Sequence, residues 1–186
     1  MRAALIVIDL QQGFDAIAAS GVARNNPQAE GNIARLLAVA RDNDIAVFHI
    51  RHSSREAGSV FAPDAPGYKV MDFAAERAGE VVIVKRVNSG FIGTNLEARL
   101  RDGGYERLFI CGATTNHCVE TTTRMAGNLG FETALIGDAC WTFERQGPEG
   151  QSHSAEAIHA MTLCNLNGEF ARIMGTDQAL VEWAAA

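Results

Sequence analysis

Three side chains that can act together in nucleophilic catalysis follow three apolar segments of the chain. Asp9 ends the apolar run 3–8, Lys85 ends the run 81–84, and Cys118 follows the run 107–111 after a short polar turn. A thiolate attacks carbonyl carbons, a carboxylate carries the proton away, and an ammonium stabilises the negative charge. Each residue taken singly has an ordinary explanation, since aspartates form turns, lysines are solvated and cysteines fill small apolar spaces.

Cys118 is expected near the start of a helix that covers residues 116–129. Unpaired N–H groups and the positive end of the helix dipole stabilise a thiolate at this place, so we expect a lowered thiol pKa. A nearby Lys85 would lower that pKa further. His117 is adjacent in sequence, but consecutive side chains on a helix diverge by about 100°, and we expect it to point away.

The elements that must position these groups alternate between strand and helix. We expect strands at 3–8, 45–50, 81–84, 107–111, 131–136 and near 169–173, and helices at 29–43, 94–101, 116–129, 152–164 and 176–183. Continuous apolar strands are typical of a parallel sheet covered on both faces. The pattern predicts one domain over residues 1–186, with a three-layer α/β/α, Rossmann-like fold around a mostly parallel sheet of six strands.

Ligands of such folds bind beyond the carboxyl ends of the strands. Asp9, Lys85, the turn 112–118 and the segment 138–141 all follow strands, so we expect them at this edge. The connection 52–80 contains two prolines and three glycines with little periodicity, and a short helical piece is expected near 71–77. A connection of this length in a compact domain is usually a functional loop or lid.

Composition excludes several classes of protein. The chain has 186 residues, of which 47% are hydrophobic and 20% charged, and a net charge of -6. This charge argues against a nucleic-acid or membrane surface, and no apolar stretch approaches the roughly 20 residues of a membrane span. The four cysteines, Cys111, Cys118, Cys140 and Cys164, form no C-x-x-C pair. We therefore expect no zinc ribbon, and a cytoplasmic protein with reduced thiols.

Three segments carry a resemblance to a known family. They are Leu-Ile-Val-Ile-Asp-Leu-Gln-Gln-Gly-Phe at 5–14, Val-Lys-Arg-Val-Asn-Ser-Gly-Phe at 84–91, and Cys-Gly-Ala-Thr-Thr-Asn-His-Cys-Val at 111–119. In this order they resemble the isochorismatase-like cysteine hydrolases, which include nicotinamidases and N-carbamoylsarcosine amidases. The similarity extends from residue 3 to about residue 174.

The resemblance implies a role for each of the three groups. Cys118 would be the nucleophile, Asp9 the proton shuttle and Lys85 its cationic partner. It also implies a cis peptide bond before Thr114, and an oxyanion hole formed by the backbone N–H groups of Thr114 and Cys118. The family forms homodimers or homotetramers and acts on small molecules, so we expect the same here.

Two departures from family patterns bear on the reaction. Metal-dependent nicotinamidases carry an Asp-x-His site, whereas here His49 and His52 lie three residues apart without an accompanying aspartate. On a strand this spacing turns the two rings to opposite faces, so we expect no metal and no cofactor. His52 could contact the substrate, although a surface or buried histidine with ordinary hydrogen bonds is the commoner case. Some true isochorismatases, which cleave a vinyl ether, lack the cysteine, so Cys118 favours C–N cleavage.

These points predict a cysteine hydrolase that cleaves a C–N bond of a small amide, lactam, imide or ureido compound through a thioester. Phe14, Asn88, Phe91 and Trp141 would line its substrate pocket, although the aromatic residues could instead pack in the core or at an interface. One alternative is a vinyl-ether hydrolase of the isochorismatase type. Another is a non-catalytic Rossmann-like binding module, which the absence of G-x-G-x-x-G after the first strand disfavours.

Overall fold

The computed structural model describes residues 2–184, and its centre is a sheet of six parallel strands. The order across the sheet is β3-β2-β1-β4-β5-β8, and every neighbouring pair is parallel. The strands are Arg2–Ile8 (β1), Ala46–His52 (β2), Val81–Lys85 (β3), Tyr105–Ala113 (β4), Glu132–Trp141 (β5) and Arg172–Met174 (β8). The predicted fold class is confirmed. Residues 1 and 185–186, which the expected single domain includes, lie outside the described part.

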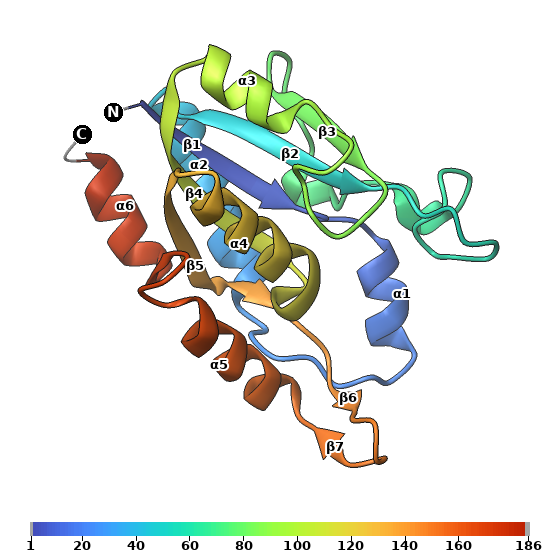
Figure 1. Ribbon diagram of the computed structural model, residues 1–186. Helices are drawn as coiled ribbons and strands as arrows, with labels where there is room; N and C mark the ends of the chain where they lie inside the picture. The colour runs from blue at the N-terminus through green and yellow to red at the C-terminus, as the bar shows by residue number, and fades with distance from the viewer. Residues whose placement is uncertain (1, 185–186) are drawn as a thin grey trace.

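Helices cover both faces of the sheet and complete three layers (Figure 1). One face carries α2 (Ala29–Asp42) and α6 (Thr176–Ala184), and the other carries α3 (Leu96–Asp102), α4 (Glu120–Asn128) and α5 (Ala155–Leu166). The apolar residues of α2 recur every three or four positions and are buried against the sheet. Within residues 2–184, no helix combines the length and the apolar character needed to cross a membrane.

The central strand β1 has helices on both of its faces, so its sequence is continuously apolar. Its residues 4–8 are all buried, as the uninterrupted apolar run predicts. Burying one such aliphatic side chain contributes about 1.5–3 kcal/mol. The strand therefore forms a rigid base from which Asp9 projects.

Strand β5 extends further than expected, because it contains a bulge. The predicted end at residue 136 is wrong: the strand continues to Trp141, and its register against β4 shifts after Leu135. Within the bulge, Asp138 accepts hydrogen bonds from the backbone N–H and the hydroxyl of Thr176, both at 2.8 Å. Asp138 therefore caps α6 rather than serving the active edge.

Two elements at this edge were not predicted. A short helix α1 (Gly13–Ala19) follows β1, and a hairpin of β6 (Arg145–Gln146) and β7 (Ser152–His153) follows β5. The helix predicted from residue 152 begins at Ala155, because Ser154 is its N-cap and accepts a hydrogen bond from the backbone N–H of Ala157 at 3.2 Å. Helix α1 and the β6–β7 hairpin both lie beyond the arrowheads of the central strands in Figure 1.

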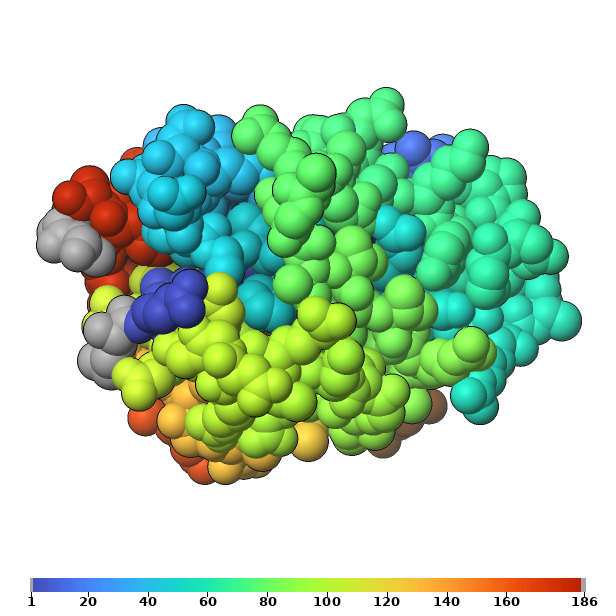
Figure 2. Space-filling model, turned by 90° about the horizontal axis from the view of Figure 1, so that it is seen from above, coloured from blue at the N-terminus to red at the C-terminus, as the bar shows by residue number. Residues whose placement is uncertain are grey.

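The connection 53–80 is folded onto α1. Its only helical pieces within this range are two single turns, η1 (Pro66–Tyr68) and η2 (Asp72–Ala74), so the helix expected near 71–77 is reduced to one turn. A Cβ atom on Gly67 would lie 2.7 Å from the Cα of Gly13, so this close approach requires a glycine. The connection forms a lobe at the right of Figure 2.

Candidate active site

The sheet register brings the predicted groups to one edge. Ile8 at the end of β1 lies beside Gly112 of β4, and His52 at the end of β2 lies beside Lys85 of β3. Asp9 follows Ile8 directly, so its side chain starts between the two pairs. Parallel strands place their carboxyl ends at the same edge, and residues separated by about 75 positions in the sequence become neighbours.

The backbone around Asp9 is unusual and closely packed. Asp9 has a positive φ of 52°, which costs an L-residue of order 1 kcal/mol or more, and its N–H donates to the carbonyl of Ile50 at 2.8 Å. Gly112 has a φ of 126°, and a Cβ atom there would lie 2.2 Å from the carbonyl oxygen of Ile8. A glycine at position 112 therefore allows β4 to lie close to the end of β1. A larger residue would push Ile8, and with it Asp9, out of place.

Lys85 reaches the site from the end of β3, and its side chain is fully buried. Its Nζ lies 2.8 Å from Oδ2 of Asp9, 3.2 Å from Sγ of Cys118 and 3.2 Å from Nδ1 of His52. An ammonium has three N–H donors, so these three acceptors use all of them. Burial acts to lower the pKa of Lys85, but the Asp9 carboxylate and the sulfur outweigh it and hold that pKa above its usual value.

Cys118 lies in a single π-helical turn, η3 (Thr115–Val119), that precedes α4. Burial raises the pKa of its thiol to about 12, and the Asp9 carboxylate adds to this effect while Lys85 opposes it. The expected lowering of the thiol pKa is therefore wrong in direction. A thiol of this kind is protonated at neutral pH, so it needs a base to react.

One oxygen of the Asp9 carboxylate is left open. Oδ2 binds Lys85, but Oδ1 is buried and has no hydrogen-bond partner among residues 2–184. Buried carboxylate oxygens are normally paired, so an open acceptor needs an explanation. The carboxylate also adds to the raised pKa of the Cys118 thiol, so the two side chains are close enough to interact.

The turn between β4 and η3 contains the cis peptide bond that the resemblance implies. The peptide bond between Ala113 and Thr114 is cis, as predicted. The carbonyl of Thr114 accepts hydrogen bonds from the N–H groups of His117 at 3.1 Å and Val119 at 3.3 Å. Thr114 and Cys118 both line the cavity above the cluster.

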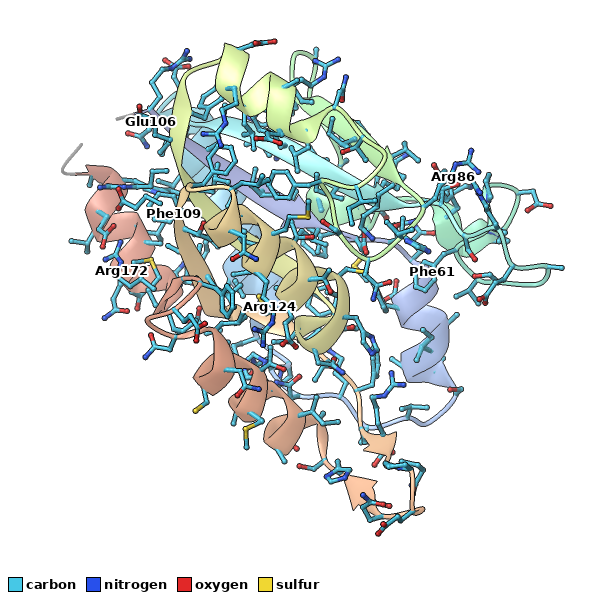
Figure 3. The ribbon with its side chains drawn as sticks, viewed as in Figure 1. Phe61, Arg86, Glu106, Phe109, Arg124 and Arg172 are labelled. Atoms are coloured by element: carbon cyan, nitrogen blue, oxygen red, sulfur yellow. The ribbon has the colours of Figure 1, made fainter. Side chains whose placement is uncertain are left out.

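The cavity has a volume of about 620 Å³, which suits a small molecule. Its apolar wall consists of Phe14, Ile17, Val22, Phe61 and Phe143. Phe61 belongs to the connection 53–80 and lies beside the start of α1 (Figure 3). The centroid of its ring is 4.8 Å from that of Phe14. The segment 142–146 supplies a polar rim.

The structure supports two of the four predicted pocket residues. Phe14 and Asn88 line the cavity, whereas Phe91 and Trp141 do not. Phe91 is buried and stacks on Phe131 with ring centroids 6.1 Å apart. Trp141 is completely buried behind the wall and meets the ring of Phe14 edge-on. Trp141 belongs to the core because β5 continues past residue 136 to reach it, and Phe91 belongs to the core because it packs on Phe131.

His117 lines the cavity, contrary to the expectation that it points away. Its Nδ1 lies 3.2 Å from the hydroxyl of Thr114, and its Nε2 lies 3.1 Å from a guanidinium nitrogen of Arg145. Burial and Arg145 lower the pKa of His117. The expectation failed because divergence from Cys118 does not keep a side chain out of the cavity, which is wide enough for both residues to line it. Phe61 was missed because it comes from an irregular connection, and Arg145 because it comes from a two-residue strand that was not predicted.

The two histidines of β2 lie on opposite faces of the sheet, as their spacing predicts. His49 hydrogen-bonds to Oε2 of Glu80 at 2.8 Å, while His52 faces Lys85 and the cavity. Among residues 2–184, no three His, Cys, Asp or Glu side chains are grouped so that they could hold a metal ion.

The fold and this edge are those of a three-layer α/β protein with a cysteine at the carboxyl end of its parallel sheet, and comparisons with known proteins identify the family. The family model for the isochorismatase domain matches residues 3–178. This protein therefore belongs to the isochorismatase family of hydrolases, which confirms the resemblance seen in the three segments.

Individual relatives agree with this assignment. The isochorismatase family protein YrdC of Bacillus subtilis is 41% identical over 179 residues, which are 96% of this chain and 95% of YrdC. A crystal structure of an isochorismatase-family protein from Chromobacterium violaceum has a TM-score of 0.95 at 41% identity and covers 100% of this chain and 95% of its own. The maleamate amidohydrolase of Pseudomonas putida is 27% identical over 193 residues, with 96% of this chain and 85% of that enzyme covered.

Proposed function

We propose that this protein is a cysteine hydrolase that cleaves a C–N bond of a small amide, lactam, imide or ureido compound. The observation that carries this proposal is the cluster of Asp9, Lys85 and Cys118 at the base of the cavity. It contains a nucleophile, an open proton acceptor and a fixed positive charge. The similarity to an enzyme named as an amidohydrolase supports a C–N bond as the target.

The first step forms a bond between sulfur and the substrate carbon. Oδ1 of Asp9 takes the proton of the Cys118 thiol as the sulfur attacks the carbonyl carbon. Because the pKa of the free thiol is about 12, proton transfer must accompany or closely precede the attack. Lys85 donates to the sulfur and stabilises the negative charge that develops there.

The carbonyl oxygen becomes an oxyanion as the sulfur attacks. The backbone N–H groups of Thr114 and Cys118 would stabilise it, since both residues line the cavity beside the thiol. One such donor contributes roughly 3 kcal/mol to the stability of a transition state.

The leaving group then departs and the enzyme is restored. Asp9 returns the proton to the substrate nitrogen, the C–N bond breaks, and an amine or ammonia leaves a thioester on Cys118. Asp9 next takes a proton from a water molecule, whose oxygen attacks the thioester carbon. The C–S bond breaks, the acid product leaves, and the proton on Asp9 returns to the sulfur. Lys85 remains charged throughout, in keeping with its raised pKa.

A substrate panel tests the proposal. Maleamate, an N-carbamoyl amino acid, a cyclic imide and a lactam would be incubated with the protein. Turnover would be measured as release of ammonia or amine for the open-chain compounds and as ring opening, by liquid chromatography, for the imide and the lactam. We expect turnover of at least one compound, and an acyl adduct on Cys118 that intact-protein mass spectrometry detects in acid-quenched samples. The variants Cys118→Ala and Cys118→Ser should lose turnover while keeping the wild-type circular dichroism spectrum.

Three outcomes would count against the proposal. Full turnover by Cys118→Ala would exclude the thioester mechanism. Cleavage of a vinyl ether such as isochorismate, with no turnover of any amide, would favour the isochorismatase-type reaction instead. Binding of panel compounds without turnover of any of them would favour the non-catalytic module.

A further inference from the structure

His52 is a neutral imidazole whose tautomer is set by the cluster. Its Nδ1 lies 3.2 Å from the ammonium of Lys85, which has only donors to offer. Nδ1 must therefore accept this hydrogen bond, and the single ring proton must lie on Nε2. Burial and the charge of Lys85 lower the pKa of His52, against the opposing charges of Asp9 and Glu56. Cys118, the fourth group at the cluster, binds the same ammonium.

The backbone of His52 is held firmly in place by one buried side chain. The N–H of His52 donates to Oε1 of Gln11 at 2.8 Å, and Nε2 of Gln11 donates to the carbonyl of His52 at 3.0 Å. Gln11 also donates to the carbonyl of Tyr68 in the connection 53–80. The ring of Phe61 meets the imidazole edge-on, with centroids 6.2 Å apart. These contacts fix the ring orientation before any ligand arrives.

The Nε2 side of the ring is available to a ligand. His52 lines the same cavity as Asp9 and Cys118. Nδ1 faces the buried Lys85, so Nε2, on the other side of the ring, lies away from it. The bond to Lys85 is the only hydrogen bond of this ring within residues 2–184. A fixed N–H donor beside the thiol is thus left without a protein partner.

We propose that His52 is a substrate-binding residue whose Nε2–H donates to a second acceptor atom of the substrate. This inference rests on the proposed function and narrows its substrate class. Compounds with a further carbonyl or carboxylate oxygen near the scissile bond, such as ureido acids, imides and half-amides of dicarboxylic acids, satisfy the donor. Simple monoamides leave the donor unpaired when they displace water, which costs binding free energy.

Two substitutions separate the two nitrogens of His52. In His52→Asn, the amide oxygen takes the place of Nδ1 and keeps an acceptor for Lys85, but the donor at Nε2 is lost. In His52→Gln, the longer side chain places an amide N–H near the position of Nε2, but the acceptor for Lys85 is lost. If His52 acts only by holding Lys85, the Asn variant should behave more like the wild type than the Gln variant. If the Nε2–H donor of His52 binds substrate, the Gln variant should behave more like the wild type.

Alkylation of Cys118 provides a readout that needs no substrate. Iodoacetamide carries a carbonyl acceptor next to its reactive carbon, and iodoethane has the same leaving group without an acceptor. The ratio of their rates, measured at Cys118 by peptide mapping, cancels any change in the thiolate fraction. We expect this ratio to fall about fivefold to tenfold in His52→Asn and to stay within about twofold in His52→Gln.

The tautomer is checked by long-range ¹H–¹⁵N NMR of protein labelled at its five histidines, with His52 assigned from the signal missing in His52→Gln. We expect an unprotonated Nδ1 and a protonated Nε2. A proton on Nδ1, or an unchanged alkylation ratio in both variants, would overturn the inference. Neither measurement involves turnover, so an active Cys118→Ala enzyme would refute the proposed function without affecting this result.

Discussion

Two ionic clusters share strand β2, and they differ in how their hydrogen-bond acceptors are filled. The first joins Asp9, Lys85 and Cys118 to His52 at the carboxyl edge. The second joins His49, three residues earlier on the opposite face, to Glu80 and Arg41. Both contain a carboxylate, a cation and a neutral histidine, so residue types alone do not distinguish them.

The second cluster is saturated with hydrogen bonds. Oε1 of Glu80 accepts from Nε of Arg41 at 2.7 Å, and Oε2 binds Nη2 of Arg41, the N–H of Arg77 and the ring of His49 at 2.8–2.9 Å. Burial acts to raise the pKa of Glu80, but these donors outweigh it and lower that pKa to about 2. Nη2 of Arg41 also donates to the carbonyl of Ala75 at 2.9 Å. This cluster fastens the start of β3 to α2.

The first cluster leaves one acceptor open. Oδ1 of Asp9 has no partner within residues 2–184, and a cavity of about 620 Å³ reaches Asp9 and Cys118. The comparison shows that similar ion pairs stabilise a fold when every acceptor is filled. In the first cluster one acceptor stays open beside the cavity, which is what the proposed chemistry requires.

The largest effect on turnover is expected when the side chain of Asp9 loses its charge but keeps its shape. Asp9→Asn keeps the size of the side chain but cannot accept the thiol proton, so turnover should fall by about 10²–10⁴-fold. Alkylation of Cys118 by iodoacetamide should become faster, because the Asp9 charge contributes to the raised pKa of the thiol. Turnover on the best compound of the panel and the alkylation rate would be measured together. A matched control is Glu80→Gln, which should change neither by more than about twofold.

The pH dependence of alkylation tests whether the thiol is protonated at rest. Because the pKa of Cys118 is raised to about 12, its thiolate fraction and its alkylation rate should rise about tenfold per pH unit from pH 7 to pH 10. Peptide mapping would separate Cys118 from the exposed Cys164. An alkylation rate that does not change with pH above pH 7 would show that Cys118 is a thiolate at rest. That result would agree with the lowered pKa expected for a thiol near the start of a helix.

A smaller effect is expected at the saturated cluster, and it concerns stability. Glu80→Gln removes the charge that binds Arg41, so the free energy of unfolding should fall by about 1.5–3 kcal/mol. The pKa of Glu80 is lowered to about 2, so its stabilising contribution is present above about pH 4.5 and is lost as the pH falls towards 2. Urea unfolding at several pH values would measure both. An equal loss of stability at pH 3 and pH 7 would contradict the assigned role.

The sequence predicted the fold because continuous apolar strands and periodic helices are local patterns. It predicted Asp9, Lys85 and Cys118 because groups that end parallel strands must meet at one edge. It did not predict the bulge that carries β5 to Trp141, since a bulge depends on pairing with β4 and not on local composition. The raised pKa of Cys118 was also missed, because burial and the distance to Asp9 become known only from packing.

The cavity wall was predicted only in part for a related reason. Phe14 follows a recognisable strand, whereas Phe61 reaches the cavity only because the connection 53–80 folds onto α1 through Gly67 and Gly13. Aromatic residues in a long connection are a weak signal by themselves. Aromatic residues that line a cavity should therefore be sought in long connections, without regular secondary structure, that cover the edge of a sheet.

The three bonds of Lys85 have a consequence for how the molecule matures. Its ammonium projects from β3 and contacts the last residue of β2 and two residues that follow β1 and β4. A slip of β3 by one residue would turn Lys85 to the opposite face of the sheet. Asp9, His52 and Cys118 would then all lose the ammonium that they contact. The three bonds of Lys85 therefore form together only when β1, β2, β3 and β4 are paired in their correct register.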